Sequence, residues 1–569
     1  MTRAILLGLA TLASCTENVQ LGERDQLAGL VAVTVTSERP ALDLVGLGGP
    51  PITVPYTAVG EFADGSTRDI TSRVDWQVDN PAPGAFVTGN RYQPSRRAAG
   101  DVTIRAVVGE IVGTTRLRVS ITATLNDSSF PPPPGADALF TPGAPVVTDP
   151  MRSPKILYPA QDTMFPQGLP HILFQHQVGM NNDALRLRFK SEVLELTVFT
   201  SADRWQPDNE IWYLLSASHP GSQVAFTVAG TSTAGPGTIY TSPEETLRFA
   251  ADDPAGILTY APGAGNAIVR AKLSSTTATK FYPAPGDSTL VSSHTVSRDG
   301  TSMALRYGGD LLQKVRISDQ RVEIGSAAAI PMGWAAFSPD GTKLLVASGG
   351  QLVLRDAQTG APIGAAGGVV NLPMKASHPD WSPDGSQVAV SMSNEVTNTE
   401  VRNGAIAVIP YNQGAFGAPV IVVPAGGMAS NIFPRWSPDG RFLAYVNTRG
   451  PGRAPKAAEL RLVSAAGGTP LQLALANRRV TGSADLRDLG NTMPWWGPSQ
   501  GKVAWLAFTS ARPYGALLPT IAQEQIWIAG VDLTRPDDPS FAAFWLPSQD
   551  VRTANSNPVW ALEPVPVSD

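Results

Sequence analysis

Cysteine is almost absent from this chain of 569 residues, which contains one, Cys15. No internal disulfide is therefore possible, and the cores must be held by packing alone. Charged residues are also few, at 16%, and the net charge of −5 excludes the basic surface that nucleic acid binding requires. The apolar stretch of residues 4–10 is too short to span a bilayer.

Known catalytic motifs are missing as well. The chain has no Gly-x-Ser-x-Gly elbow, no Walker loop, no glycine-rich dinucleotide loop and no His-Glu-x-x-His pair. We therefore expect no catalytic residues, no cofactor and no metal.

Glycine and proline are abundant, with 54 and 50 residues. Together with the low charge, this composition favours many short strands and turns over helices. We expect an all-β protein, in which two β-sandwich domains are followed by a six-bladed β-propeller closed by the C-terminal strand.

The propeller is predicted from a repeated turn. Ser-Pro-Asp-Gly occurs three times, ending at Gly341, Gly385 and Gly440, and an imperfect copy ends at Gly300. Alternating apolar runs follow each copy, and Asp-Gly between two such runs is the strongest short-range hairpin signal. The glycines are 41, 44 and 55 residues apart, a period typical of propeller blades. We expect the turn aspartates to cap the backbone, one in each blade: Asp299, Asp340, Asp384 and Asp439.

A second repeat, Pro-x-Trp, marks the first strand of a blade and extends the count to six. It ends at Trp381, Trp436, Trp496 and Trp560, but the last copy has no hairpin after it. The strands that follow Ile257 lack a first strand of their own. We therefore expect the strand near Val559 to pair with them and close the ring, which would leave no long sheet edge unpaired.

The combined pattern, Pro-x-Trp-Ser-Pro-Asp-Gly with an apolar residue and alanine further on, resembles the WD40-like (PD40) repeat of the TolB propeller family. The copies at Trp381–Ala389 and Trp436–Ala444 are nearly perfect, and the resemblance covers the chain from Ile257. It implies a six-bladed propeller of the bacterial envelope over residues 251–569. It does not name a ligand, because propellers host both binding proteins and enzymes.

The N-terminus has the features of a secretory signal. Arg3 precedes a short apolar stretch, and Leu12-Ala13-Ser14-Cys15 resembles a bacterial lipobox. The resemblance implies a signal peptide over residues 1–14, lipidation of Cys15 and a tether over residues 15–26. Thr16, which is not an aspartate, favours the outer membrane, with the protein facing the periplasm or the cell surface. The alternative is an ordinary secreted protein whose signal ends in cysteine.

Residues 27–125 are predicted to form the first sandwich. About seven short alternating segments fall in this region, and the run from Tyr56 through Asp64-Gly65-Ser66 to Trp76 resembles the bacterial Ig-like domain, group 2. In that family the module is a spacer or an adhesive element. Trp76 is expected in the sandwich core.

A proline-rich linker is predicted over residues 126–154, extended and semi-rigid. Residues 155–250 follow as a second sandwich, loosely similar to fibronectin type III, with Ile211–Leu214 as one of its strands. Trp205 and Trp212 are expected in its core or at a domain contact, and a sugar-binding floor is the alternative.

Two groups of residues are candidates for binding. His294 and His378 lie at the starts of first strands, where they either converge on the channel to bind a metal or carboxylate, or hydrogen-bond neighbouring strand ends. Long loops between blades concentrate positive charge that either meets an anionic partner or is simply solvated: Arg449, Arg453, Lys456, Arg478 and Arg479.

The sequence therefore indicates a lipid-anchored envelope protein whose propeller binds a protein or polysaccharide partner without catalysis. One alternative is a channel enzyme such as a lyase, lactonase or glycosidase. The other is a purely adhesive surface protein in which the Ig-like domain is the active part.

Overall fold

The computed structural model describes residues 27–263, 266–284, 286–426, 429–449, 457–478, 489–498, 501–519 and 523–564. The predicted signal peptide and tether lie outside these residues, and so do several predicted site residues, namely Cys15, Arg453, Lys456 and Arg479.

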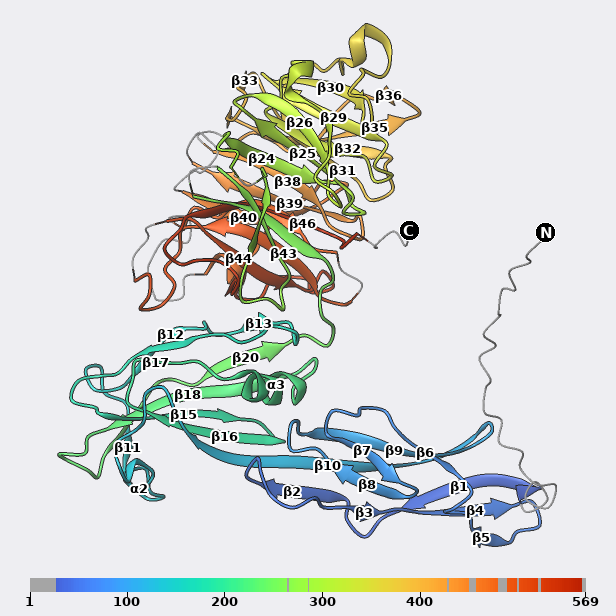
Figure 1. Cartoon of the computed structure of the whole chain (residues 1–569), viewed down its shortest axis with the longest axis vertical. Coiled ribbons are helices and arrows are strands. Elements are labelled where there is room, and N and C mark those ends of the chain that lie inside the picture. Colours follow the sequence, from blue (N-terminus) through green and yellow to red (C-terminus); the bar gives the residue numbers. More distant parts are fainter. Residues whose placement is uncertain are drawn as a thin grey trace, which may run out of the picture. The chain divides into compact units, whose positions relative to one another are not determined.

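The chain divides into two compact units, Met1–Ser120 and Ile121–Asp569. Strands dominate both units, which confirms the predicted all-β class (Figure 1). Over the residues that the structure describes, no helix has the length and apolarity needed to cross a membrane.

The first unit is built from short strands with buried and exposed residues in alternation, as along β4 and β9. They form sheets ordered β1-β4-β5, β3-β8-β7 and β6-β9-β10, with β2 beside β10. The strands are β1 (Leu30–Thr36), β2 (Ala41–Val45), β3 (Val54–Pro55), β4 (Thr57–Phe62), β5 (Thr67–Asp69), β6 (Asp75–Val78), β7 (Gly84–Thr88), β8 (Arg91–Pro94), β9 (Gly100–Val108) and β10 (Ile111–Asn126).

Trp76 belongs to an aromatic group with Tyr56, Phe86 and Tyr92, whose ring centroids lie 5.3 to 6.5 Å apart. Its indole N–H donates to the carbonyl oxygen of Thr71 at 3.1 Å. The tryptophan is therefore a packing residue. The assignment of this unit to the Ig-like family stays a prediction.

The second unit begins with a mixed sheet. Its order is β11-β19-β18-β15-β16-β10, with β20 beside β18 and β13 beside β20, and a smaller sheet has the order β12-β14-β17. The elements are α2 (Ala136–Leu139), β11 (Val146–Val147), β12 (Lys155–Tyr158), β13 (Thr163–Phe165), β14 (Phe174–Gln177), β15 (Ala184–Lys190), β16 (Leu194–Thr200), β17 (Arg204–Trp205), α3 (Asn209–Ala217), β18 (Gln223–Thr231), β19 (Ile239–Thr241) and β20 (Glu245–Phe249).

This region differs from the predicted fibronectin-like sandwich in two ways. Strand pairs β10/β16, β11/β19 and β13/β20 are parallel, whereas that sandwich is antiparallel throughout. In addition, the predicted strand Ile211–Leu214 is part of helix α3. Asp208 caps the helix by accepting a hydrogen bond from the Ile211 amide at 2.8 Å, and Ile211, Trp212, Leu214 and Leu215 are all buried, as helical spacing allows.

The proline-rich segment 126–154 also departs from the prediction of an extended spacer. It contains the short helix α2, and its strand β11 joins the mixed sheet through β19. Phe140 packs on Phe199 with ring centroids 5.6 Å apart. Ala136 and Phe140 therefore join the segment to a core of the second unit, while most of its other residues are exposed.

Six further sheets make up the propeller. Their orders are β46-β21-β22-β23, β24-β25-β26-β27, β28-β29-β30, β31-β32-β35 with β36 and β37 beside β35, β38-β39-β40-β41 and β42-β43-β44-β45, and β33 pairs with β34 in a side hairpin. The elements are β21 (Ile257–Pro262), β22 (Ile268–Ala271), β23 (Thr279–Tyr282), β24 (Val291–Val296), β25 (Ser302–Tyr307), β26 (Leu311–Arg316), β27 (Val322–Ile324), β28 (Trp334–Phe337), β29 (Lys343–Ser348), β30 (Gln351–Asp356), β31 (Lys375–Trp381), β32 (Gln387–Ser393), β33 (Glu395–Val396), β34 (Val401–Arg402), β35 (Ala405–Asn412), β36 (Ala415–Phe416), β37 (Val420–Val423), β38 (Ser430–Trp436), β39 (Phe442–Thr448), β40 (Ala458–Ser464), β41 (Leu471–Gln472), α4 (Ala474–Asn477), β42 (Thr492–Trp496), β43 (Ala504–Ser510), β44 (Gln525–Val531), β45 (Phe544–Trp545) and β46 (Asn555–Ala561), with 3-10 turns at Ser326–Ala328 and Ala365–Gly368.

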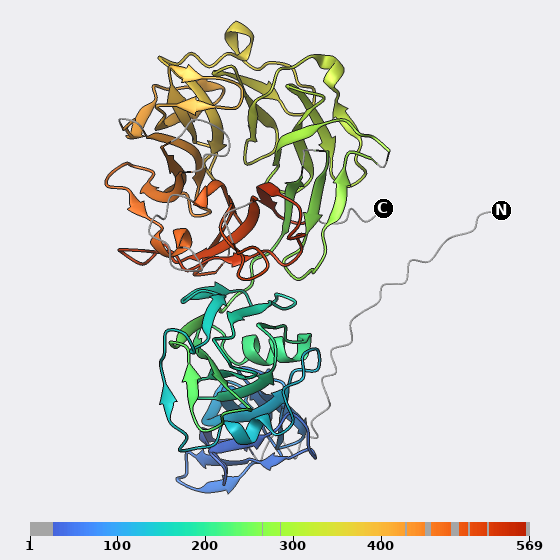
Figure 2. The ribbon, with the colours of Figure 1, turned by 90° about the vertical axis from the view of Figure 1, so that its left-hand side faces the viewer.

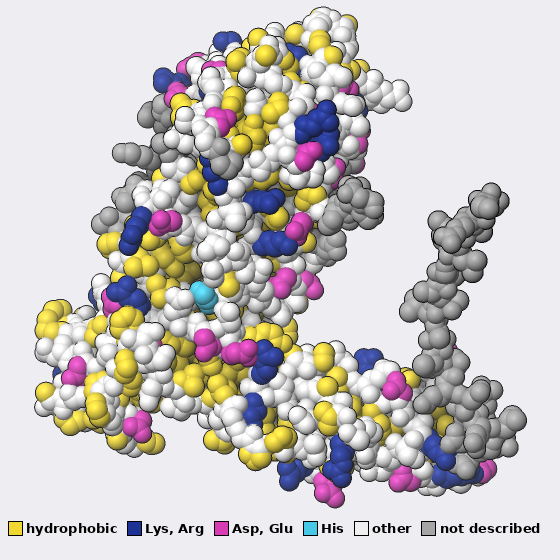
Figure 3. Space-filling view, in the orientation of Figure 1, with side chains coloured by type: hydrophobic (Ala, Val, Ile, Leu, Met, Phe, Trp, Pro, Cys, Tyr) yellow, Lys and Arg dark blue, Asp and Glu magenta, His cyan; other side chains and the backbone are white. Residues whose placement is uncertain are grey.

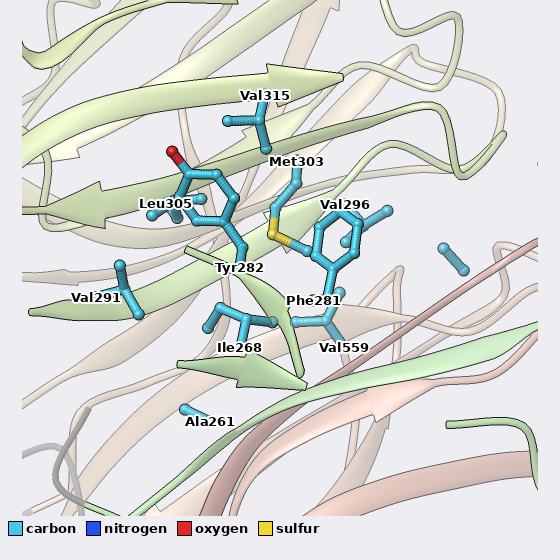
Figure 4. Packing of buried hydrophobic residues seen from close by; sticks show 11 residues of the cluster. Ala261, Ile268, Phe281, Tyr282, Val291, Val296, Met303, Leu305, Val315 and Val559 are labelled. Atoms are coloured by element: carbon cyan, nitrogen blue, oxygen red, sulfur yellow. The ribbon is translucent and has the colours of Figure 1, made fainter. Parts of the chain in front are cut away.

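The C-terminal strand β46 completes the first sheet by pairing antiparallel with β21, so that Val559 lies opposite Thr259. Figure 2 shows the sheets arranged in a ring, with this strand beside the earliest propeller strands. Each first strand contacts the next around the ring, in the order β24, β28, β31, β38, β42 and β46. Figure 4 shows side chains from β46 and the first two blades packed into one core, which includes Val559, Phe281 and Met303.

Candidate functional site

A cavity of about 220 Å³ lies at one end of the first strands, close to the repeated turns. Residues of β31, β38, β42 and β46 line it, together with Val296 of β24 and Arg298 just after that strand. Because five of the six first strands contribute, the cavity lies at the central channel of the ring. We call it the channel pocket.

The charged residues of the channel pocket are Arg298, Asp380 and Arg435. Arg435 is nearly buried, with 8% of its side chain exposed, and its Nη1 lies 3.5 Å from Oδ1 of Asp380. The same Nη1 donates to the carbonyl oxygen of Pro379 at 3.2 Å, while Nε has no partner among the described residues. The Arg435 guanidinium, which has five N–H donors, is therefore incompletely used.

Asp380 is held by the neighbouring blade. Its Oδ2 accepts a hydrogen bond from the backbone amide of Trp436 at 2.7 Å. Burial raises the pKa of Asp380, while Arg435 and Arg298 act in the opposite direction. The two arginines and one carboxylate leave the pocket with an excess of one positive charge when all three are ionised.

Tryptophans form the frame of the pocket. The guanidinium carbon of Arg435 lies 4.2 Å from the ring centroid of Trp495, a cation–π contact. The indole N–H groups of Trp436, Trp495 and Trp496 donate to backbone carbonyls of adjacent blades at 2.9 to 3.1 Å. These bonds fix the rings in place, so that the pocket is formed before any ligand arrives.

The candidate histidines are placed elsewhere along the first strands. His294 hydrogen-bonds Thr259 at 2.9 Å and Asn557 at 3.1 Å, which links neighbouring strands. His378 packs against Trp334 and Phe433, with ring centroids 5.0 and 4.0 Å away. Burial, together with Arg435, lowers the pKa of His378 well below 6.5, so its ring is neutral. No group of three or more potential metal ligands occurs among the described residues.

The basic loops are partly described. Arg449 and Arg478 are exposed. Arg478 is close enough to Glu245 in the mixed sheet to influence its pKa. The structure therefore associates Arg478 with the body of the second unit, and the remaining members of the predicted basic group lie outside the described residues. Figure 3 shows Lys and Arg interspersed with Asp and Glu over the visible face, without a large patch of one sign.

The turn aspartates bond their own turns. In each repeat an aspartate oxygen accepts from the backbone amide two residues on, at 3.0 to 3.1 Å, and also from the turn serine hydroxyl. Trp205 and Trp212, the candidate sugar floor, are buried at 5% and 2% exposure among phenylalanines.

Sequence reasoning missed the charged residues of the channel pocket. A signal for two of them is present in the Pro-x-Trp repeat, where the middle residue is Asp380, Arg435 or Trp495. Successive residues of a strand face opposite sides, so the middle residue lies on the face opposite its tryptophan, and in β38 and β42 both residues line the pocket.

No family model matches the chain, and no curated protein matches it. Many solved structures resemble it, and three of them show the range. TolB from Acinetobacter baumannii is 13% identical, with 60% of this chain and 80% of that chain covered and a TM-score of 0.36. A protein described as TolB from Agrobacterium tumefaciens is 16% identical, with 52% and 90% covered and a TM-score of 0.31.

The third is the dihydro-heme d1 dehydrogenase NirN in complex with DHE, 16% identical, with 52% of this chain and 54% of that chain covered and a TM-score of 0.30. The chain is thus similar to proteins of the TolB type and to an enzyme alike. Likenesses this distant carry no argument about function.

Proposed function

We propose that this protein is a lipid-anchored, non-catalytic binding or scaffold protein of the bacterial cell envelope, whose propeller recognises a protein or glycan partner at the channel pocket. The observation that carries the proposal is the incompletely paired guanidinium of Arg435, buried in a preformed pocket of tryptophans. Concave sites with aromatic walls and a few fixed polar groups are typical binding sites.

The enzyme alternative has less support in this pocket. Glycoside hydrolysis requires two carboxylates that flank the bond to be broken. Among the described residues that line the channel pocket, Asp380 is the single carboxylate, and it is already bonded to the Trp436 amide. The arrangement favours holding a ligand over proton transfer.

The envelope location depends on the lipobox at Leu12–Cys15. Several acyl chains on Cys15 would anchor the protein firmly, at about 0.8 kcal/mol for each buried methylene. Replacing Cys15 by alanine should move the protein from the membrane fraction to the soluble fraction and abolish labelling by radioactive palmitate. If the Cys15→Ala variant stays in the membrane fraction, the anchor is contradicted. The same holds if the wild-type protein takes up no palmitate.

Partner binding is tested by photo-crosslinking in the cells that naturally produce the protein. A photoreactive amino acid in place of Leu562, an exposed residue at the pocket, should give one discrete adduct that Arg435→Lys abolishes. The same amino acid in place of the exposed Val322 on β27 is the matched control and should give none. An adduct formed in place of Val45, in the first unit, would favour the adhesive alternative instead.

A further inference from the structure

The channel pocket has a ligand preference that its charges and hydrogen bonds define. Arg435 and Arg298 line it from different blades, and Asp380 is the one carboxylate that its described lining offers them. Arg298 Nη2 donates to the Trp381 carbonyl oxygen at 2.7 Å, which holds this arginine at the pocket. The 3.5 Å separation between Arg435 Nη1 and Asp380 Oδ1 is longer than a charge-assisted hydrogen bond, which measures about 2.8 Å. The internal pair is therefore loose, and the guanidinium has unused donors, although Nε itself is fully buried and only the Nη groups can reach a ligand.

We propose that the channel pocket binds the carboxylate of an acidic protein segment, with Arg435 and Arg298 holding the carboxylate and Trp495 contacting the apolar part of the same segment. This inference deepens, and rests on, the proposed partner-binding function. The carboxylate belongs either to a side chain or to the C-terminus of the partner chain. Its arrival supplies the second negative charge that the two arginines lack.

The size of the pocket supports a single group over a whole small molecule. A cavity of about 220 Å³ is smaller than the range of about 300 to 1,000 Å³ in which free small ligands are usually enclosed. A carboxylate with a few carbon atoms fits this space while the rest of a partner remains outside. Leu562, 43% exposed at the pocket, offers an apolar surface for the adjoining residues.

The lining favours a peptide over an acidic sugar. A uronate would bring several hydroxyl groups, each of which needs a hydrogen-bond partner when buried. Among the described lining residues, Ser437 has the only side-chain hydroxyl, and no side-chain amide is present. The indole N–H groups of Trp436, Trp495 and Trp496 already donate to backbone carbonyls.

The test measures binding of paired probes to the full-length protein by calorimetry, with tryptophan fluorescence as a second readout. The probes are N-acetyl-glutamate methylamide against its glutamine analogue, N-acetyl-leucine against N-acetyl-leucinamide, and glucuronate against glucose. We expect at least one of the two peptide-like carboxylates to bind at least tenfold more tightly than its neutral analogue. The first pair reports a side-chain carboxylate and the second a chain terminus.

Variants then assign the preference to the pocket. Arg435→Lys and Arg298→Gln should each reduce the carboxylate preference about tenfold. If Arg435→Lys does not fold, Arg298→Gln still tests the inference, because it changes an exposed residue and leaves the buried ones in place. Asp380→Asn should strengthen carboxylate binding severalfold, because it removes the competing internal anion, whereas a purely structural role predicts no gain. Arg441→Gln, at an exposed arginine paired with Asp439 in a turn, is the control and should change nothing.

Equal binding of acids and amides would overturn the inference, and so would a preference that survives both arginine variants. Tighter binding of glucuronate than of either peptide-like acid would overturn the peptide assignment. The crosslink from the Leu562 position shows whether the carboxylate inference fails alone or whether the proposed partner binding fails with it. An adduct that persists in Arg298→Gln, with no carboxylate preference, leaves partner binding intact and refutes the recognised chemistry alone.

Discussion

Thr259 pairs with Val559 across 300 residues of sequence, where the first propeller sheet takes its innermost strand from the end of the chain. The Thr259 hydroxyl also donates to the Val559 carbonyl oxygen at 3.2 Å, and it contacts His294 of the next blade at 2.9 Å. One residue thus connects the two ends of the propeller to each other and to the neighbouring sheet. The closing strand β46 is therefore bonded to the sheet it completes.

Replacing Val559 by aspartate should destabilise the propeller by about 4 kcal/mol, because a charge would be placed in a fully buried position without a partner. Urea denaturation followed by tryptophan fluorescence measures the loss. Val420→Asp, at an exposed position of β37, is the matched control and should cost less than about 1 kcal/mol. Equal stability of the two variants would mean that ring closure contributes little.

Helix α3 provides a test of the region where the predicted strand proved to be a helix. Asp208→Ala removes the side chain that accepts from the Ile211 amide, and a lost N-cap costs about 1 kcal/mol. Asp208→Asn should be close to neutral, since asparagine caps as well as aspartate does. A strand at this position would respond equally to both substitutions, so identical unfolding midpoints would contradict the helix.

The sequence was sufficient for the propeller because each blade repeats its own local signals. The turn at Asp384-Gly385 and the tryptophan before it predict a hairpin without knowledge of distant residues. The same reasoning failed at Ile211–Leu214, where four apolar or aromatic residues in succession suit a buried strand and a buried helix equally. Asp208, a capping residue three positions before Ile211, is the local signal that favours the helix.

The channel pocket could not be predicted from the sequence as a site. Asp380 and Arg435 belong to successive copies of the Pro-x-Trp repeat, 55 residues apart, and Arg298 is far from both. Alternation along a strand indicates which face each residue occupies, but not that these blades place them around one cavity. Their meeting depends on the diameter of the closed ring, which is a property of all six sheets together.

The turn aspartates should stabilise the propeller in a pH-dependent way. Burial acts to raise the pKa of Asp340, but hydrogen bonds from Ser338 and Thr342 outweigh it and lower the pKa to about 2. A lowered pKa means that the stabilisation is present above the unfolded-state value of 3.8 and is lost as the pH falls through the folded value. Asp340→Ala should cost about 1 kcal/mol at pH 7, from lost hydrogen bonds, and much less near pH 2.

Comparison of Asp340→Ala with wild type by urea denaturation at pH 7 and near pH 2 checks this. Asp319→Ala, at an exposed aspartate outside the repeated turns, serves as the control. A cost that is independent of pH would show that the side chain acts through packing and not as a charged acceptor.

Glu245 should have the opposite pH dependence. Burial raises the pKa of its carboxyl from 4.5 to about 7, assisted by Asp162 and opposed by Arg478, while Arg248 pairs with Asp162. Its Oε2 has no hydrogen-bond partner among the described residues. Below pH 4.5 the group is protonated in both states and carries no penalty. Between pH 4.5 and 7 the unfolded chain ionises first, so stability falls as the pH rises.

Glu245→Gln removes this penalty, so the variant should match wild type near pH 4 and exceed it by about 1 to 3 kcal/mol at pH 8. Urea denaturation across that range provides the measurement, and the exposed neighbour Glu244→Gln is the control. A constant difference between Glu245→Gln and wild type at every pH would contradict the raised pKa.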